Sequence, residues 1–117
     1  MCKVRFQISK DAMTMLSVAG YVGPVRDGRD NRPDARDAVG GLVNCTWDQG
    51  LLAQGYAAAT ITTSLGGAER LAEWFAAIQE KLESGDLTTR GETYLRDVKA
   101  ARARIRRALG INDGRRA

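Results

Sequence analysis

The residues best suited to chemistry are basic side chains near the C-terminus. Lys99, Arg102 and Arg106 recur at spacings of three and four, which places them in a row along one flank of a helix. Arg96 and Arg107 extend this basic surface around the back of the same helix. Such a row can neutralise phosphates and release their counterions, so the pattern favours an anionic partner such as nucleic acid.

The net charge of +4 is concentrated in this region. Residues 1–84 carry nine Lys/Arg and ten Asp/Glu, whereas residues 85–117 carry nine and four. The preceding helix has its own acidic side chains, which could pair with the basic row: Glu69, Glu73, Glu80 and Glu83. Two interpretations are therefore open, a face paired within the molecule and a face that binds an anionic partner.

Catalytic chemistry has little support. The chain has no histidine, and Cys2 and Cys45 have no second cysteine at ligand spacing, which excludes a zinc site and a Cys–His nucleophile. No glycine-rich phosphate loop opens a helix. We therefore predict a non-enzymatic protein without metal or cofactor, with free thiols in a reducing cytoplasm.

Residues 51–75 resemble a helix-turn-helix of the kind found in small repressors. The residues that carry the resemblance are Leu51, Leu52, Gly55, Ile61, Leu65, Gly66, Leu71, Trp74 and Phe75. The resemblance implies that Arg70 reads a base in the major groove. It departs from the family in the second glycine, Gly67, and in Glu69 and Glu73, which would repel phosphate.

The N-terminus resembles a ribbon-helix-helix protein. Polar Lys3, Arg5 and Gln7 alternate with apolar Val4, Phe6 and Ile8, the period of a half-buried strand, and a helix follows. The resemblance implies that Lys3 and Arg5 contact DNA, and pairing of two such strands is one route to a homodimer. An ordinary edge or hairpin strand explains the alternation equally well.

The elements that position these residues begin with a helix capped by Ser9. It runs through about Ala19, with Met13 and Leu16 inward, and ends at Gly20. Residues 23–37 interleave arginine with aspartate around two prolines, which predicts an exposed, mobile loop.

The central region gives conflicting signals. Leu42 and Val43 could end a strand or a helix. Thr46-x-x-Gln49 fits a capping box that opens a short helix up to Gly55. Residues 56–64 combine alanines, which favour helix, with threonines and Ile61, which favour strand, so this window is left open.

The C-terminal half predicts an antiparallel helical hairpin. The first helix ends near Ser84-Gly85, and the second starts at the capping box Thr89-x-x-Glu92 and stops at Gly110, before a basic tail over 110–117. The apolar stripes of the two helices are Leu71, Trp74, Phe75, Ile78 and Leu82, and Tyr94, Val98, Ala101, Ile105 and Leu109.

Together these patterns predict one α+β domain over residues 1–117, mostly helical, with a short N-terminal β element. No apolar run is long enough to span a membrane, so we expect a cytoplasmic protein. The favoured function is a small regulator that binds nucleic acid through its basic C-terminal helix. The alternative is an inhibitor or adaptor that docks on a larger protein, because the composition is similar to that of anti-CRISPR-like anti-defence proteins of phages and mobile elements.

Overall fold

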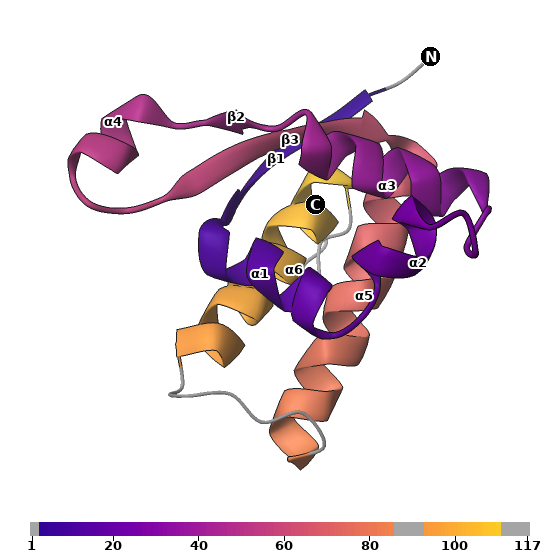
Figure 1. The fold of residues 1–117 in the computed structure, drawn as a ribbon. Helices are drawn as coiled ribbons and strands as arrows, with labels where there is room; N and C mark the ends of the chain where they lie inside the picture. The colour runs from indigo at the N-terminus through magenta and orange to yellow at the C-terminus, as the bar shows by residue number, and fades with distance from the viewer. Residues whose placement is uncertain (1–2, 86–92, 111–117) are drawn as a thin grey trace.

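A small antiparallel sheet forms the top of the molecule in the computed structural model, which describes residues 3–85 and 93–110 (Figure 1). Strand β3 (Ala58–Ser64) lies between β1 (Lys3–Ser9) and β2 (Thr46–Trp47), giving the order β1-β3-β2. Phe6 lies opposite Ile61 in the register, and both are buried. The sheet and the helices confirm the mostly helical α+β fold.

Helix α1 (Lys10–Val18) continues directly from β1. Ser9 caps it by accepting a 3.2 Å hydrogen bond from the Ala12 backbone N–H, as predicted. Leu16 is fully buried, whereas Met13 is only half-buried and Met15 takes the second inward position. The buried face of α1 is therefore rotated slightly relative to the predicted one.

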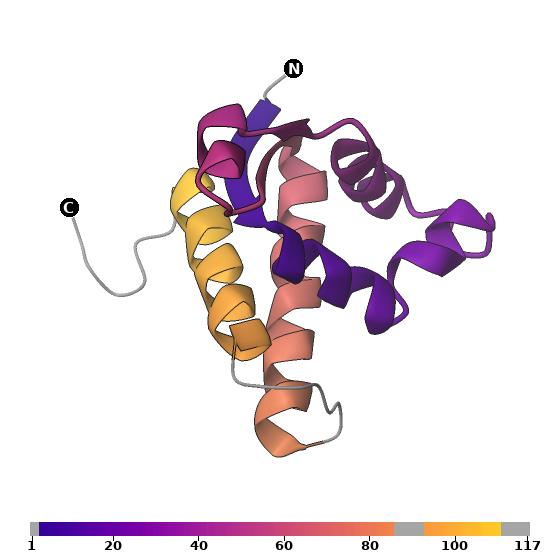
Figure 2. The same cartoon turned by 60° about the vertical axis from the view of Figure 1, so that its left-hand side comes forward.

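The predicted helical hairpin is confirmed by α5 (Leu65–Ser84) and α6 (Thr93–Ala108), which run antiparallel and side by side in Figures 1 and 2. Leu71, Phe75 and Ile78 of α5 are fully buried, as are Val98 and Ile105 of α6. The first helix ends at Gly85, whose left-handed φ of 87° favours glycine. The predicted Thr89–Glu92 capping box and residues 111–117 of the tail lie outside the described residues.

The prediction of an exposed loop holds for residues 27–32 but is wrong for the rest of the segment 23–37. This segment contains α2 (Val22–Arg26) and the start of α3 (Pro33–Val43), so Leu42 and Val43 end a helix. Proline begins α3, where a missing N–H costs nothing, and a stripe of small apolar residues is buried: Ala35, Ala38 and Val39. Because alanines are small and only weakly hydrophobic, they give a weak helical stripe in the sequence. The charged residues between them therefore led to the prediction of a loop.

Two local predictions in the central region also need correction. Helix α4 (Gln49–Ala53) forms, but Asp48 caps it, and Thr46 belongs to β2. The open window 56–64 is resolved as β3. This strand pairs with β1 along its whole length and with β2 at Ala59 and Thr60, and this pairing outweighs the helix propensity of the alanines.

These strands overturn the implied DNA-binding folds. A helix-turn-helix cannot form over residues 51–75, because β3 separates α4 from α5. The ribbon-helix-helix arrangement is wrong as well, because β1 pairs with β3 of its own chain. The homodimer stays a prediction, which light scattering can check.

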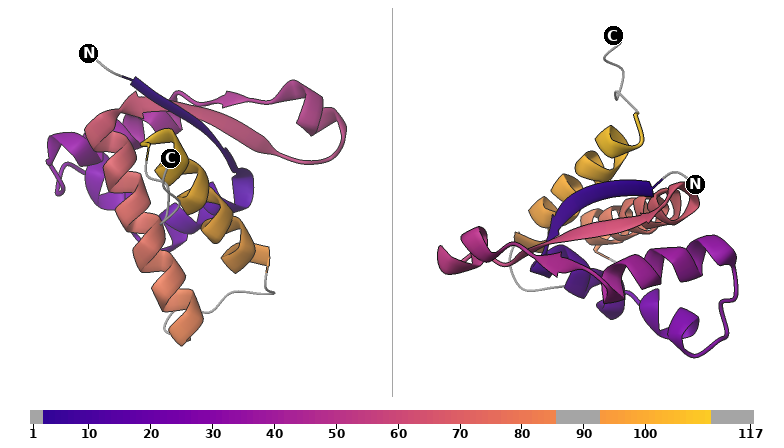
Figure 3. Two further views of the ribbon diagram at one scale, coloured as in Figure 1. Left: turned by 180° about the vertical axis from the view of Figure 1, so that it is seen from behind. Right: turned by 90° about the horizontal axis from the view of Figure 1, so that it is seen from above.

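Apart from α4, which lies at the far end of the β2–β3 connection, the helices form two layers (Figure 1). Helices α1, α2 and α3 lie in front of α5 and α6 in Figure 1, and the view from behind in Figure 3 presents α5 and α6. Among the described residues, no helix combines the length and the apolar character needed to cross a bilayer.

Candidate anion-binding surface

Basic residues occupy the part of α6 that does not face the core. Val98, Ala101 and Ile105 form its buried stripe against α5 and the sheet. The remaining sides carry what we call the basic face: Arg96, Lys99, Arg102, Arg104, Arg106 and Arg107. Asp97 is the single acidic residue of Thr93–Ala108, so the helix carries a large positive excess.

Three residues of the predicted row meet in one hollow between α5 and α6. Lys99, Arg102 and Arg106 line it together with Ala103 of the same helix and Gln79 of α5, around a volume of about 280 Å³. Arg102 Nη1 donates to Gln79 Oε1 over 3.3 Å, so this hydrogen bond goes to a neutral amide and leaves the positive charge uncompensated by it. The fold therefore concentrates positive charge at this place, as the helical spacing predicts.

The alternative of pairing within the molecule applies to part of this face. Lys99 Nζ lies 3.6 Å from Glu83 Oε2, and both side chains are about half exposed. Arg96 Nε lies 3.6 Å from Asp97 Oδ1 in its own helix. Glu73 forms its ion pair with Arg70 of its own helix, α5. An exposed pair such as Lys99–Glu83 contributes only a fraction of a kcal/mol, so a phosphate can displace Glu83 at little cost.

Two contacts fix α6 against the sheet. Arg104 Nη1 donates to the Gln7 carbonyl over 3.4 Å, at the free edge of β1. The Ser9 hydroxyl donates to Asp97 Oδ2 over 2.9 Å while it caps α1. Arg104 was not among the predicted site residues, although it lies on the same basic helix, and its contact shows that part of the basic face positions the helix.

Lys3 and Arg5 lie on the exposed face of the sheet and not in the α5–α6 hollow. They are opposite Ser64 and Thr62 of β3. Lys3 and Arg36 line a separate polar depression of about 420 Å³ beside the start of α5. The structure thus distributes the predicted cations over at least two surfaces.

Arg70 is used inside the fold. Its Nε and Nη2 donate to Asp34 Oδ2 over 3.2 and 2.9 Å, and its Nη1 donates to Glu73 Oε1 over 3.0 Å. Its side chain is 18% exposed. The Arg70 guanidinium lowers the pKa of Asp34 by hydrogen bonding to its charged form. Arg70 therefore joins α3 to α5 and lies outside the basic face.

The described residues contain no group of three or more His, Cys, Asp or Glu side chains able to hold a metal ion, and Cys45 is a free, half-buried thiol. Comparison with protein-family models, with curated proteins and with solved structures finds no match for this chain.

Proposed function

We propose that the protein is a small regulator that binds nucleic acid through the basic face of α6. The observation that carries the proposal is the convergence of Lys99, Arg102 and Arg106 on one hollow lined otherwise by an amide and an alanine. A guanidinium group presents a planar fork of N–H donors that matches a phosphate, and a lysine adds a point charge.

The spacing of these residues suits a phosphate backbone. Lys99 and Arg106 are separated by about 10 Å along the helix axis, because each residue of an α-helix rises about 1.5 Å. Double-stranded DNA carries one negative charge per roughly 1.7 Å of its axis, so this row meets more than one phosphate. Contacts of this kind supply affinity without reading sequence.

Salt dependence tests the proposal. If about four phosphates are contacted, affinity for random duplex DNA should fall by about two orders of magnitude between roughly 50 and 200 mM salt. The double variant R102A/R106A should make the salt slope shallower by about two, because each lost phosphate contact removes close to one unit.

The matched control is the double variant R26A/R36A, which removes two exposed arginines from α2 and α3. Its salt slope should remain that of the wild-type protein. If the salt dependence of DNA affinity becomes shallower in both double variants, only the total charge matters, and the proposal of a defined binding surface is contradicted. Absence of duplex binding even at low salt would favour the alternative, docking on a larger protein.

A further inference from the structure

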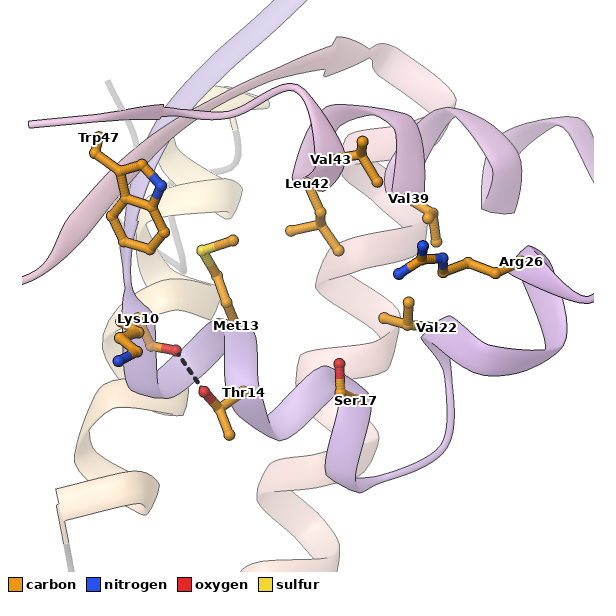
Figure 4. A pocket seen from close by; sticks show the side chains of 10 residues that line it. All are labelled: Lys10, Met13, Thr14, Ser17, Val22, Arg26, Val39, Leu42, Val43 and Trp47. Carbon is orange, nitrogen blue, oxygen red and sulfur yellow. Dashed lines mark hydrogen bonds between the residues drawn. The ribbon is translucent and has the colours of Figure 1, made fainter.

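An apolar groove opens on the side of the molecule away from the α5–α6 hollow. It lies between α1, α2, α3 and β2 and has a volume of about 350 Å³. Figure 4 shows Met13 and Leu42 facing each other across it, with Trp47 at one end and Val22 at the other.

The walls of the groove are faces of two helices. Helix α1 contributes Lys10, Met13, Thr14 and Ser17, at the spacing of one helical face, and α3 contributes Val39, Leu42 and Val43. Val43 is 66% exposed and Trp47 is 36% exposed. An apolar groove whose lining reaches solvent is a candidate interaction site on a folded domain.

The two ends of the groove are positively charged. Lys10 lies near Trp47, and Arg26 lies near Val22 (Figure 4). The residues that line the groove include no carboxylate. Within residues 3–85 and 93–110, neither the Lys10 ammonium nor the Arg26 guanidinium forms an ion pair. The groove is therefore complementary to a ligand that is apolar in its middle and acidic at its ends.

We propose that this groove binds a short acidic, amphipathic helix of a partner protein. Recognition follows the helix-in-groove mode, in which apolar residues at i, i+3 or i+4 fill the groove. Lys10 and Ser17 are about 10 Å apart along α1, which matches about two turns of a bound helix. A carboxylate near each end of that helix would meet Lys10 and Arg26. This inference is independent of the nucleic-acid proposal.

The test uses a library of random 12-residue peptides displayed on phage, selected on the full-length protein. We expect the selected peptides to combine Leu, Ile, Phe or Trp at helical spacing with flanking Asp or Glu. Synthetic copies should shift the fluorescence of Trp47, and this shift should be absent in W47F, because Trp74 is buried and far less responsive.

Two groove variants and one control make the test decisive. V43E and the double variant K10E/R26E should each weaken peptide binding by about tenfold or more, because both place negative charge against an acidic ligand. V18E introduces the same charge at an exposed valine of α1 outside the groove and should bind like the wild-type protein.

Three outcomes would overturn the proposal: no selected binder, binders without acidic residues, or binding that V43E leaves unchanged. Light scattering tests the other possible occupant of the groove, a second copy of this chain. If the protein is a dimer that V43E converts to a monomer while V18E does not, the groove is filled by a second copy and not by an acidic helix.

Discussion

Gly67 lies where α5 approaches α3 and β3. A Cβ atom here would overlap Thr63 Oγ1 and come within 3.1 Å of the Ala38 backbone nitrogen. Thr63 Oγ1 is held by a 2.8 Å hydrogen bond that it donates to the Asp37 carbonyl. We expect G67A to lower the free energy of unfolding by about 1–3 kcal/mol in urea denaturation, because backbone or a buried hydroxyl must move.

Gly66 is the matched control, one residue earlier in the same helix. A Cβ atom there would lie 3.4 Å from Asp34 Cβ, an ordinary van der Waals contact. G66A should change the free energy of unfolding by less than about 0.5 kcal/mol. Equal losses in the two variants would mean that the glycines matter for backbone conformation and not for the close packing of α5.

Several aspartates make the stability depend on pH. Arg32 lowers the pKa of Asp30 to about 2, mainly through a side-chain hydrogen bond, and Arg70 lowers the pKa of Asp34. The Leu51 N–H and the Gln7 amide lower the pKa of Asp48. An unfolded aspartate titrates near 3.9, so the contribution of these groups is complete above about pH 5 and is lost as the pH falls toward the folded values.

Asp34→Asn tests this linkage. At pH 6 the free energy of unfolding of the variant should be about 1 kcal/mol below that of the wild-type protein, because the variant lacks the Asp34–Arg70 ion pair that joins α3 to α5. The difference from the wild-type protein should shrink as the pH falls below the unfolded aspartate value of about 3.9 and toward the lowered pKa of Asp34. Asp27→Asn, which alters a more exposed pair with Arg29, is the control. A pH-independent difference for Asp34→Asn would contradict the ion pair as its cause.

At the scale of elements, Ser9 connects β1, α1 and α6. Its hydroxyl accepts from the Ala12 N–H at the start of α1 and donates to Asp97 of α6, and the residue is 5% exposed. We expect S9A to lower the free energy of unfolding by about 1–3 kcal/mol, since it removes a cap and leaves a carboxylate without its donor.

A double-mutant cycle with D97N separates the two roles of Ser9. If the Ser9–Asp97 hydrogen bond matters, the losses from S9A and D97N should be less than additive in urea denaturation. Ser64→Ala, which removes the cap of α5 together with a 2.7 Å hydrogen bond to Asp37 Oδ2 at a half-exposed position, is the comparison for the same pair of contacts nearer to solvent. Additive losses from S9A and D97N would reduce Ser9 to an ordinary N-cap.

Elements could be predicted from the sequence where their decisive interactions are local. The cap at Ser9, the stripe of α5 and the basic row of α6 depend on residues within a few positions of one another. Strand β3 could not be resolved, because its identity depends on pairing with β1, which is far away in the sequence: Ser9 pairs with Ala58 and Lys3 with Ser64. Helix α3 was missed for a similar reason: Asp34 bonds to Arg70 on another helix.

The candidate site divides in the same way. The row of Lys99, Arg102 and Arg106 follows from helical periodicity, whereas the hollow around it requires Gln79 from α5. The apolar groove was not predicted at all. Its walls come from α1 and α3, and the sequence pattern of residues 23–37 gave no sign that a helix would begin there.

The whole molecule carries its two proposed binding surfaces on opposite sides. The apolar groove belongs to the layer formed by α1, α2 and α3, and the basic face belongs to the layer formed by α5 and α6 (Figures 1 and 3). Helix α1 packs between the groove and α6, so the core separates the two surfaces. Their ligands can therefore bind at the same time.

This arrangement predicts that an acidic groove peptide does not compete with duplex DNA. At about 0.15 M salt, where charges farther apart than about 8 Å are largely screened, saturating peptide should change the Kd for DNA by less than about twofold. The measurement is fluorescence anisotropy of labelled duplex, with and without the selected peptide.

R102A/R106A should weaken DNA binding without changing the Kd of the peptide, and V43E should weaken peptide binding without changing the Kd for DNA. Mutual displacement of peptide and DNA would instead place both anionic ligands on one basic surface, the α6 face, and would remove the groove as a separate site.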